Sequence, residues 1–481
     1  MPSADGAAAR PRGQAGAGQP AGPIGPAEQD ALVEMLQALI RIPTVNPPGD
    51  EILAARYVDD LLRDEGLEPE LLEPFPGRAS IVARLRGAGG GGEPLLLLSH
   101  LDVVPAPAEG WRHDPFSGDV AGGFVWGRGA IDMKSTLATQ LAVVRRLAAE
   151  TRAAGRDPAR DPVPGLRRDL VLAATADEEA GGFEGAGWIV DHRPELLQAA
   201  AALTEAGGIG LVFGGRRFYP IQVAERGFVV YRLTFRGTWG HGSVPRDDNA
   251  AVLAAEAVVR LTGPGAPRPT PVMERFIETV AAGLPPAAAA ALRGAVDPDP
   301  TRSEAALAEL CGEPYRRTLR AVLRDTISPD VIRAGVKYNV IPGTAEIEID
   351  VRTLPGTDEA AMTAELRRRL GEALWERTSV EVTGRGAAVE APTDSPLYRI
   401  LEATLRDHDP AGVPVPVMAH FATDAKHLAR IGVPTYGFSP LRLGPGDPYL
   451  ELFHADDERV PLAGLRFGLS VLYDVVRRYC G

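Results

Sequence analysis

Two uninterrupted apolar runs constrain the fold more than any other feature of this sequence. Residues 95–105 read LLLLSHLDVVP, and residues 169–179 read DLVLAATADEE. Runs of this length without polar alternation are typical of strands that are buried on both faces. Between them, residues 135–150 repeat apolar side chains at the spacing of an amphipathic helix. Strands alternating with helices predict an α/β domain with a mixed, largely parallel sheet flanked by helices.

A second pattern begins near Arg226. Residues 227–243, GFVVYRLTFRGTWGHGS, alternate apolar and polar side chains, as in a sheet with one solvated face. We expect a helix over 249–262, two strands joined at Pro342-Gly343, a helix over 358–374 and a strand over 379–386. This order predicts a ferredoxin-like α+β domain, inserted in the α/β domain. An Ala- and Pro-rich stretch at about 264–330 predicts a helical insertion within it.

These patterns divide the chain into segments with expected boundaries. We expect a disordered tail over 1–26, because it is rich in Ala, Gly and Pro. The α/β domain is expected in two parts, 27–225 and 388–481, with the inserted α+β domain over 226–387.

Composition excludes several classes of partner and location. The 481 residues carry 51 Lys and Arg against 64 Asp and Glu, a net charge of −13, so nucleic acid or an anionic membrane is not an expected partner. Two cysteines, Cys311 and Cys480, exclude a disulfide framework and are expected to be reduced thiols. The N-terminal residues lack a secretory signal's apolar core, and no apolar run reaches eighteen residues, so we expect a cytoplasmic protein.

Histidines and acidic residues gather in five short segments. The candidate residues are His100 and Asp102 in SHLDVVP, Asp132 in GRGAIDMKS, Glu178 and Glu179 in ATADEEAGG, Glu205 in LTEAGG and His454 in ELFHADDERV. Each segment alone is weak, because acids in loops are usually solvated or cap helices. Four of the five follow apolar strands or their Gly turns, the rim where open α/β sheets bind ligands. Imidazole and carboxylate ligands suit zinc, so the segments together predict a metal site.

The ordered segments SHLDVVP, WGRGAIDMKS, ATADEEAGG, TEAGG, GHGSVP, KYNVIPGTAEIEIDVRTLPG and HADDERV resemble one known family. It is the co-catalytic di-zinc metallopeptidase family of aminoacylases, glutamate carboxypeptidase, carboxypeptidase S and succinyl-diaminopimelate desuccinylase. The resemblance runs from about Gln29 to the C-terminus. It implies that two Zn²⁺ ions are bound, with Co²⁺ as a substitute. By this resemblance Asp132 bridges the two ions, His100 and Glu205 hold one of them, and Glu179 and His454 hold the other.

The resemblance also implies roles for residues that do not bind metal. Glu178 is the implied general base, and Asp102 supports His100 from behind. His241, in GHGSVP, is implied to reach the active site of a partner subunit and stabilise the oxyanion, so a homodimer formed through the inserted domain is expected. Asn339 in KYNVIP and Arg352 in DVRTLPG match positions that contact substrate, and Arg suits bidentate capture of a carboxylate.

The sequence also departs from the family pattern in ways that bear on substrate. Phe421 and Ala422 stand where the family has two glycines beside the substrate pocket, which predicts a bulkier wall. Glu205 is the glutamate form of a position that is aspartate in the family's aminopeptidases, which favours acylase, deacylase or carboxypeptidase action. The insertion at about 264–330 resembles the larger lids of carboxypeptidase S-like members.

Two classes of function follow. The first is a di-zinc metallohydrolase that cleaves an amide or peptide bond in a small N-acyl amino acid or dipeptide, with acylase and peptidase action both open. The alternative is a non-catalytic metal or amino-acid binding protein on the same scaffold. No GxSxG elbow and no GxxxxGK[ST] loop is present, so serine-hydrolase and nucleotide chemistry are not indicated. His113, in WRHDPF, is expected to be structural.

Overall fold

The computed structural model describes residues 22–310, 312–447 and 449–481. Most of the expected tail, and Cys311, therefore lie outside the described residues. The first helix, α1, begins at Pro26 and buries Leu32, Leu36 and Leu39. Cys480, at the end of the last helix, is a buried free thiol. Within the described ranges, no helix is long and apolar enough to span a membrane.

A mixed sheet of eleven strands forms the larger body of the described chain. Its order is β1-β2-β6-β3-β7-β18-β9-β8-β19, with β16 and β17 also paired to β9. The strands are β1 (Glu70–Phe75), β2 (Arg78–Leu85), β3 (Leu95–His100), β6 (Leu170–Thr175), β7 (Ala201–Thr204), β8 (Ile209–Phe213), β9 (Arg216–Glu225), β16 (Val389–Glu390), β17 (Val413–Ala419), β18 (Thr435–Gly437) and β19 (Leu441–Arg442). Its centre is parallel, because β3 runs parallel to both β6 and β7, and β18 runs parallel to β7.

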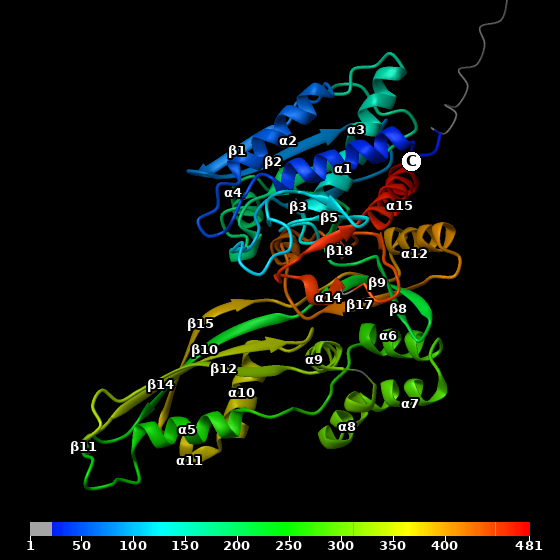
Figure 1. Ribbon diagram of the computed structural model, residues 1–481. Helices are drawn as coiled ribbons and strands as arrows, with labels where there is room; N and C mark the ends of the chain where they lie inside the picture. The colour runs from blue at the N-terminus through cyan, green and yellow to red at the C-terminus, as the bar shows by residue number, and fades with distance from the viewer. Residues whose placement is uncertain (1–21, 311, 448) are drawn as a thin grey trace, which may run out of the picture.

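Helices cover both faces of this sheet, as Figure 1 shows for α1, α2 and α3 above it. They are α1 (Pro26–Ile40), α2 (Ile52–Asp64), α3 (Lys134–Ala153), α4 (Ala186–His192), α12 (Pro396–His408), α13 (Ala425–Leu428) and α15 (Leu462–Cys480). Short elements complete this body: β4 (Val120–Ala121), β5 (Phe124–Trp126) and β20 (Arg459–Pro461) in a three-stranded sheet, α14 (Tyr449–Leu452), and the 3-10 turns η1 (Glu178–Ala180), η2 (Pro194–Leu196) and η3 (Ala429–Ile431). The expected α/β class is therefore confirmed.

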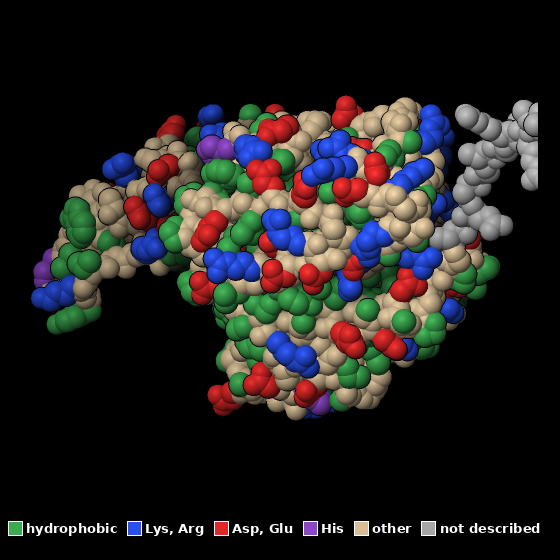
Figure 2. Space-filling model, turned by 90° about the horizontal axis from the view of Figure 1, so that it is seen from above, with side chains coloured by type: hydrophobic (Ala, Val, Ile, Leu, Met, Phe, Trp, Pro, Cys, Tyr) green, Lys and Arg blue, Asp and Glu red, His purple; other side chains and the backbone are tan. Residues whose placement is uncertain are grey.

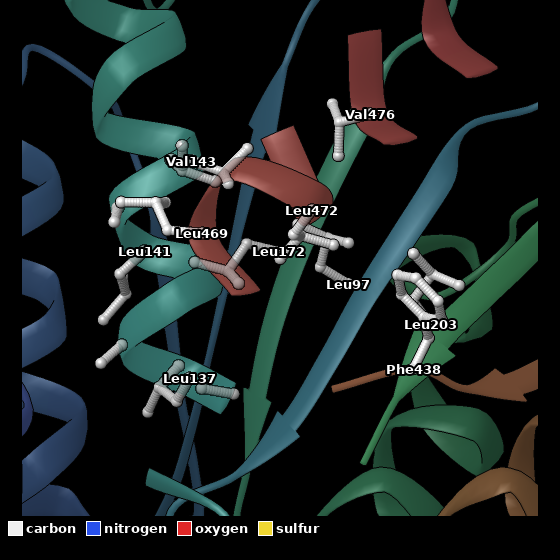
Figure 3. Packing of buried hydrophobic residues seen from close by; sticks show 14 of the residues in the cluster. Leu97, Leu137, Leu141, Val143, Leu172, Leu203, Phe438, Leu469, Leu472 and Val476 are labelled. Carbon is white, nitrogen blue, oxygen red and sulfur yellow. The ribbon is translucent and has the colours of Figure 1, made fainter. Parts of the chain in front are cut away.

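The leucine run of β3 is buried on both faces, as its sequence predicts. Leu95 and Leu97 pack into the core with α3 and α15, where Leu141 and Leu472 lie close by (Figure 3). Leu96 and Leu98 pack on the opposite face with residues of α4 and α13. Burying each such side chain stabilises the fold by about 1.5–3 kcal/mol. The end of β3 is therefore a rigid point from which to present a side chain.

A second sheet projects from this body (Figure 1). Its order is β12-β14-β10-β15 and all its pairs are antiparallel. Its elements are β10 (Gly227–Arg236), α5 (Ala250–Leu261), β12 (Thr326–Ala334), β14 (Thr344–Thr353), α10 (Glu359–Leu370), α11 (Glu372–Trp375) and β15 (Thr378–Gly386), with β11 (Gly240–His241) paired to β13 (Val340–Ile341). Helices α5 and α10 pack on one face in a core of their own. This is the expected ferredoxin-like arrangement.

One expected strand lies elsewhere. We expected two strands joined at Pro342-Gly343, but β14 pairs with β12 and β10, and the residues between β12 and β14 form only the two-residue β13. The strand was hidden because Pro329 stands within it. β12 is an edge strand, and its pairing shifts between Pro329 and Val331, so the missing N–H is tolerated.

The helical insertion consists of α6 (Pro271–Ala281), α7 (Pro286–Gly294), α8 (Pro300–Leu310) and α9 (Glu313–Val322), and it ends before the expected boundary at 330. It does not extend the core of the second sheet. Met273, Ile277 and Leu292 pack instead with Phe218 of β9 and Met418 of β17. The insertion therefore covers one edge region of the main sheet, as Figure 1 shows for α6 beside β8 and β17.

Candidate metal centre

Three neighbouring parallel strands present their polar residues at one edge of the main sheet. His100 is the last residue of β3, Glu178 and Glu179 form the start of η1 after β6, and Glu205 directly follows β7. Because β3 lies between β6 and β7 and is parallel to both, these carboxyl ends adjoin one another. Sequence patterns alone predicted this convergence.

Asp132 lies at the centre of the cluster, just before α3. Its Oδ1 is 3.1 Å from Nε2 of His100, and its Oδ2 is 3.4 Å from Nε2 of His454. His454 Nε2 is also 3.3 Å from Oε2 of Glu179, and His100 Nε2 is 3.8 Å from Oε2 of Glu205. The two oxygens of one carboxylate thus face two different histidines, each beside a different glutamate.

The donor set fits metal ions. Two groups of ligand atoms, His100 with Asp132 and Glu179, and His100 with Glu178 and Glu205, each lie within 4.8 Å of one another. Oε1 of Glu179 is buried and has no hydrogen-bond partner among the described residues, so the protein leaves a negatively charged oxygen unsatisfied there. Imidazole nitrogen and carboxylate oxygen are ligands that zinc accepts.

Crowding of carboxylates dominates the electrostatics. Burial, reinforced by the charge of Glu205, raises the pKa of Glu178 well above its usual range. Burial and the charge of Asp132 raise the pKa of Glu205 to about 8. Burial also raises the pKa of Glu179. Side chains that are costly to ionise together in one pocket are stabilised by a divalent cation.

The pKa values of His100 and His454 rise and that of Asp132 falls, so these three side chains favour their charged forms. Hydrogen bonds to Asp132 and Glu179 raise the pKa of His454 to about 10. Burial opposes protonation of His100, but the charge of Glu205 and hydrogen bonds to Asp102 and Asp132 outweigh it and raise the His100 pKa. The same hydrogen bonds outweigh burial at Asp132 and lower its pKa.

Asp102 supports the cluster in a way that sequence spacing did not predict. Nδ1 of His100 is 3.0 Å from the backbone carbonyl oxygen of Asp102 and 3.4 Å from its carboxylate. The carboxylate accepts hydrogen bonds from Nδ2 of Asn46 at 2.8 Å and from the backbone N–H groups of Glu178 and Glu179, at 3.2 and 3.1 Å. Asp102 therefore ties the end of β3 to the η1 turn.

Glu458 and Lys426 are contacts that the sequence reasoning missed. Glu458 is fully buried, pairs with Arg128 at 2.6 Å, and accepts hydrogen bonds from the backbone N–H groups of Ile131 and Asp132. Both Arg128 and Glu458 stand within quoted motifs, GRGAID and HADDERV, which was the available signal. Nζ of Lys426 lies 3.9 Å from Oε1 of Glu178, in the segment that resembles the family's pocket wall.

Three residues around the cluster adopt left-handed backbone conformations without being glycine. Asp177, before Glu178, has φ 72°; Ala206, after Glu205, has φ 67°; and His454 itself has φ 58°. Such conformations cost roughly 1–3 kcal/mol each and persist where surrounding structure enforces them, most often at functional sites. No sequence signal predicts them.

The remaining candidates lie outside the cluster. His241 is exposed at β11, where its Nδ1 contacts Ser243 Oγ at 2.7 Å, and Asn339 lies beside it. Arg352, near the body-side end of β14, pairs with Asp350 at 2.9 Å and stacks over Phe228. His113 contacts Asp119 at 3.0 Å and packs on the ring of Trp126, as expected of a structural histidine.

An imidazole and carboxylate cluster at the carboxyl edge of an α/β sheet is the arrangement of a metal-dependent hydrolase. The sequence model of Peptidase family M20/M25/M40 matches residues 96–478, so the chain belongs to this family. Aminoacylase-1 of Homo sapiens is 28% identical over 453 residues, 93% of this chain and 95% of that protein. The N-fatty-acyl-amino acid synthase/hydrolase PM20D1 of Xenopus tropicalis is 28% identical over 451 residues, 90% and 83% of the two chains.

Solved structures share the fold. An M20 family metallo-carboxypeptidase from Sulfolobus solfataricus has a TM-score of 0.67 at 18% identity, with 93% of this chain and 99% of that chain covered. Human carnosine dipeptidase 1 has a TM-score of 0.62 at 17% identity, with 94% and 97% covered. The chain is a hydrolytic enzyme of a metal-dependent family that cleaves amide or peptide bonds, rather than a non-catalytic binding protein on that scaffold.

Proposed function

We propose that this enzyme hydrolyses the amide bond of a small N-acyl amino acid or dipeptide at a centre that holds two zinc ions. Asp132 would hold both ions, with His100 and Glu205 as ligands of one and Glu179 and His454 as ligands of the other. The observation that carries this proposal is the position of the Asp132 carboxylate between two histidines: one of its oxygens faces His100 and the other faces His454.

The residues of the chain supply the proton chemistry. Zinc held by these residues would supply Lewis-acid chemistry, polarising the substrate carbonyl and lowering the pKa of a water molecule to roughly 7. Glu178 accepts a proton from the attacking water and delivers it to the leaving nitrogen. Its raised pKa suits a group that must both take and give a proton near neutral pH. Lys426, 3.9 Å away, favours the ionised form in which Glu178 can act as a base.

The substrate class is supported by the relatives. Aminoacylase-1 and the N-fatty-acyl-amino acid synthase/hydrolase both carry names that refer to N-acyl amino acids, and both align along nearly the whole chain. Arg352 and Asn339 are proposed substrate contacts. Lys426 is a further cation, within reach of Glu178, for a substrate carboxylate.

We further propose that the enzyme is a homodimer in which His241 stabilises the oxyanion in the partner subunit's site. The support is position: His241 lies at the far end of the projecting sheet, away from its own metal cluster (Figure 1). Large apolar side chains are exposed around it: Trp239 is 56% exposed, Val244 67% and Tyr338 96%. Figure 2 shows apolar side chains at the end of this projection. Such a surface is typical of an interface.

Replacing Glu178 tests the mechanism. Glu178→Gln keeps the size of the side chain and removes the proton acceptor, so we expect kcat to fall by at least ~10²-fold while two zinc ions per chain remain by elemental analysis. Glu195→Gln is the matched control, because Glu195 is exposed and pairs with Arg193 away from the cluster. Full activity of the Glu178 variant, or one zinc per wild-type chain, contradicts the proposal.

A further inference from the structure

An apolar chamber of about 390 Å³ lies between the helical insertion and the main sheet. One wall is formed by Met273, Phe276 and Val280, which lie on one face of α6, together with residues of α7 and α9. The opposite wall includes Ile209 and Phe213 of β8. The volume is in the range of roughly 300–1,000 Å³ that is common for small-molecule sites.

The chamber begins at the metal cluster. Ala206 and Gly207 line it and directly follow Glu205. Tyr449 also lines it, and burial together with the charges of Asp132 and Glu205 raises the pKa of its hydroxyl. Gln222 lines it too, and its buried Oε1 has no hydrogen-bond partner among the described residues. The cluster end therefore carries polar groups.

The rest of the chamber is uncharged. No Lys, Arg, Asp or Glu lines it in the part of the chain that the structure describes. His420 lines it, and burial lowers the pKa of His420, so the imidazole is neutral near pH 7. The lining follows β8 from Ile209 to Phe213, a distance of ~13 Å at the usual rise of a strand. Phe421, predicted from the sequence as a bulky pocket wall, lines the chamber as well.

We propose that this chamber binds the aliphatic acyl chain of an N-acyl amino acid whose chain has about eight to twelve carbons. A C–C bond of ~1.5 Å advances an extended chain by roughly 1.25 Å, so ~13 Å corresponds to about ten carbons. The inference rests on the proposed hydrolysis. Water adds its hydroxyl to the acyl carbon and a proton to the nitrogen, the C–N bond breaks, and a fatty acid and an amino acid leave.

The acyl group fits the chamber better than the amino-acid half. The amino acid carries a carboxylate, and an uncharged apolar chamber would bury that charge without a partner. The chamber is also longer than the side chain of any common apolar amino acid. The carboxylate end therefore belongs outside the chamber, and Lys426, which lies beside Glu178 and does not line the chamber, is a cation available to it.

A chain-length series tests the assignment. With N-acyl phenylalanines from acetyl to palmitoyl, kept below their micelle concentrations, kcat/KM should rise by up to fourfold per methylene and level off between eight and twelve carbons. A profile that is flat or falls beyond acetyl overturns the assignment of the chamber to the acyl chain, while leaving the proposed hydrolysis intact. Hydrolysis of none of these substrates contradicts the proposed function instead.

A binding measurement distinguishes failure of the acyl-chain assignment from failure of the proposed hydrolysis. Calorimetry should show that decanoate binds, with a negative heat-capacity change from apolar burial, and that acetate binds far more weakly. This readout does not need turnover. Decanoate binding no tighter than acetate binding overturns the chamber whatever the activity is.

Substitutions at two neighbouring positions test whether the acyl chain of the substrate binds in the chamber. Ala288 of α7 lines the chamber, whereas Ala287, next to it, is exposed and does not line it. Ala288→Trp should lower kcat/KM for the decanoyl substrate by at least tenfold and leave the acetyl substrate unchanged. Ala287→Trp should change neither. Equal effects of the two variants, or an equal loss for both substrates with Ala288→Trp, contradict the proposal.

Discussion

The carboxylate of Asp102 accepts a hydrogen bond of 3.1 Å from the backbone N–H of Glu179. The residue expected only to orient a histidine therefore also holds the turn that carries a metal ligand and the proposed base. Its carboxylate receives three N–H donors from Asn46, Glu178 and Glu179. All three donors favour an ionised acceptor.

We expect Asp102→Asn to lower zinc affinity or kcat by about 10–100-fold, because an amide at this position turns an NH₂ group toward N–H donors. Competition with a chelator measures the affinity, and steady-state kinetics measures kcat. Asp119→Asn is the matched control, since Asp119 is exposed and contacts His113 away from the cluster. A wild-type affinity and kcat for the Asp102 variant would show that the η1 turn does not need this anchor.

Zinc binding should become tighter as pH rises from 6 to 9. The pKa of Glu205 is raised to about 8 and that of His454 to about 10, so both groups carry protons near neutral pH that a metal ion must displace. Each displaced proton adds a tenfold gain in affinity per pH unit below the pKa of its group. Calorimetric titration of chelator-treated protein in two buffers of different ionisation enthalpy counts the protons released. Proton uptake, or an affinity that does not change with pH, is the contrary outcome.

Much of the metal cluster could be predicted because strand periodicity fixes where an apolar run ends. His100 ends one buried strand, Glu178 and Glu205 follow two others, and the carboxyl ends of adjacent parallel strands meet at one edge. The position of His454 and the pairing of Arg128 with Glu458, 330 residues apart in sequence, carry no periodic signal, so only the resemblance or the structure could supply them.

For the helical insertion, by contrast, the sequence did not predict which part of the protein it packs against. The apolar face of α6 indicates that Met273 and Ile277 are buried, yet periodicity does not say against what. They pack on the main sheet rather than on the sheet in which the insertion lies in sequence, and this placement creates the chamber. Strand β12 was missed because Pro329 interrupts its pattern at an edge where pairing does not require every N–H.

The insertion is held by an ion pair that should be measurable in stability. Arg324 is 1% exposed and donates to Glu304 Oε1 at 2.7 Å and to Ser303 Oγ at 2.8 Å. Glu304→Gln leaves a buried guanidinium without its counter-charge. We expect the free energy of unfolding to fall by on the order of 2 kcal/mol. This is less than the 3–5 kcal/mol that breaking a fully buried pair costs, because the Glu304 side chain is 24% exposed.

Chemical denaturation followed by fluorescence checks this loss, with Arg302→Gln as the control on the same helix. Arg302 is 69% exposed and pairs with Asp297, so its replacement should change the free energy of unfolding much less than Glu304→Gln does. Equal small effects of both substitutions would mean that Arg324 is stabilised by Ser303 and its backbone surroundings without Glu304.

The proposed role of His241 can be tested by mixing subunits. His241→Ala removes the oxyanion contact and Glu178→Gln removes the base, so each homodimer should be nearly inactive. In a mixed dimer, one site combines an intact Glu178 with the partner's intact His241, and the other site has neither. We therefore expect up to about half of the wild-type kcat per mixed dimer, because His241 lies at the far end of the projecting sheet from its own metal cluster (Figure 1) and would serve only the opposite site. Tags of different size allow the mixed species to be isolated and its activity measured. No recovery in verified mixed dimers, or full activity of the His241→Ala homodimer, contradicts the role.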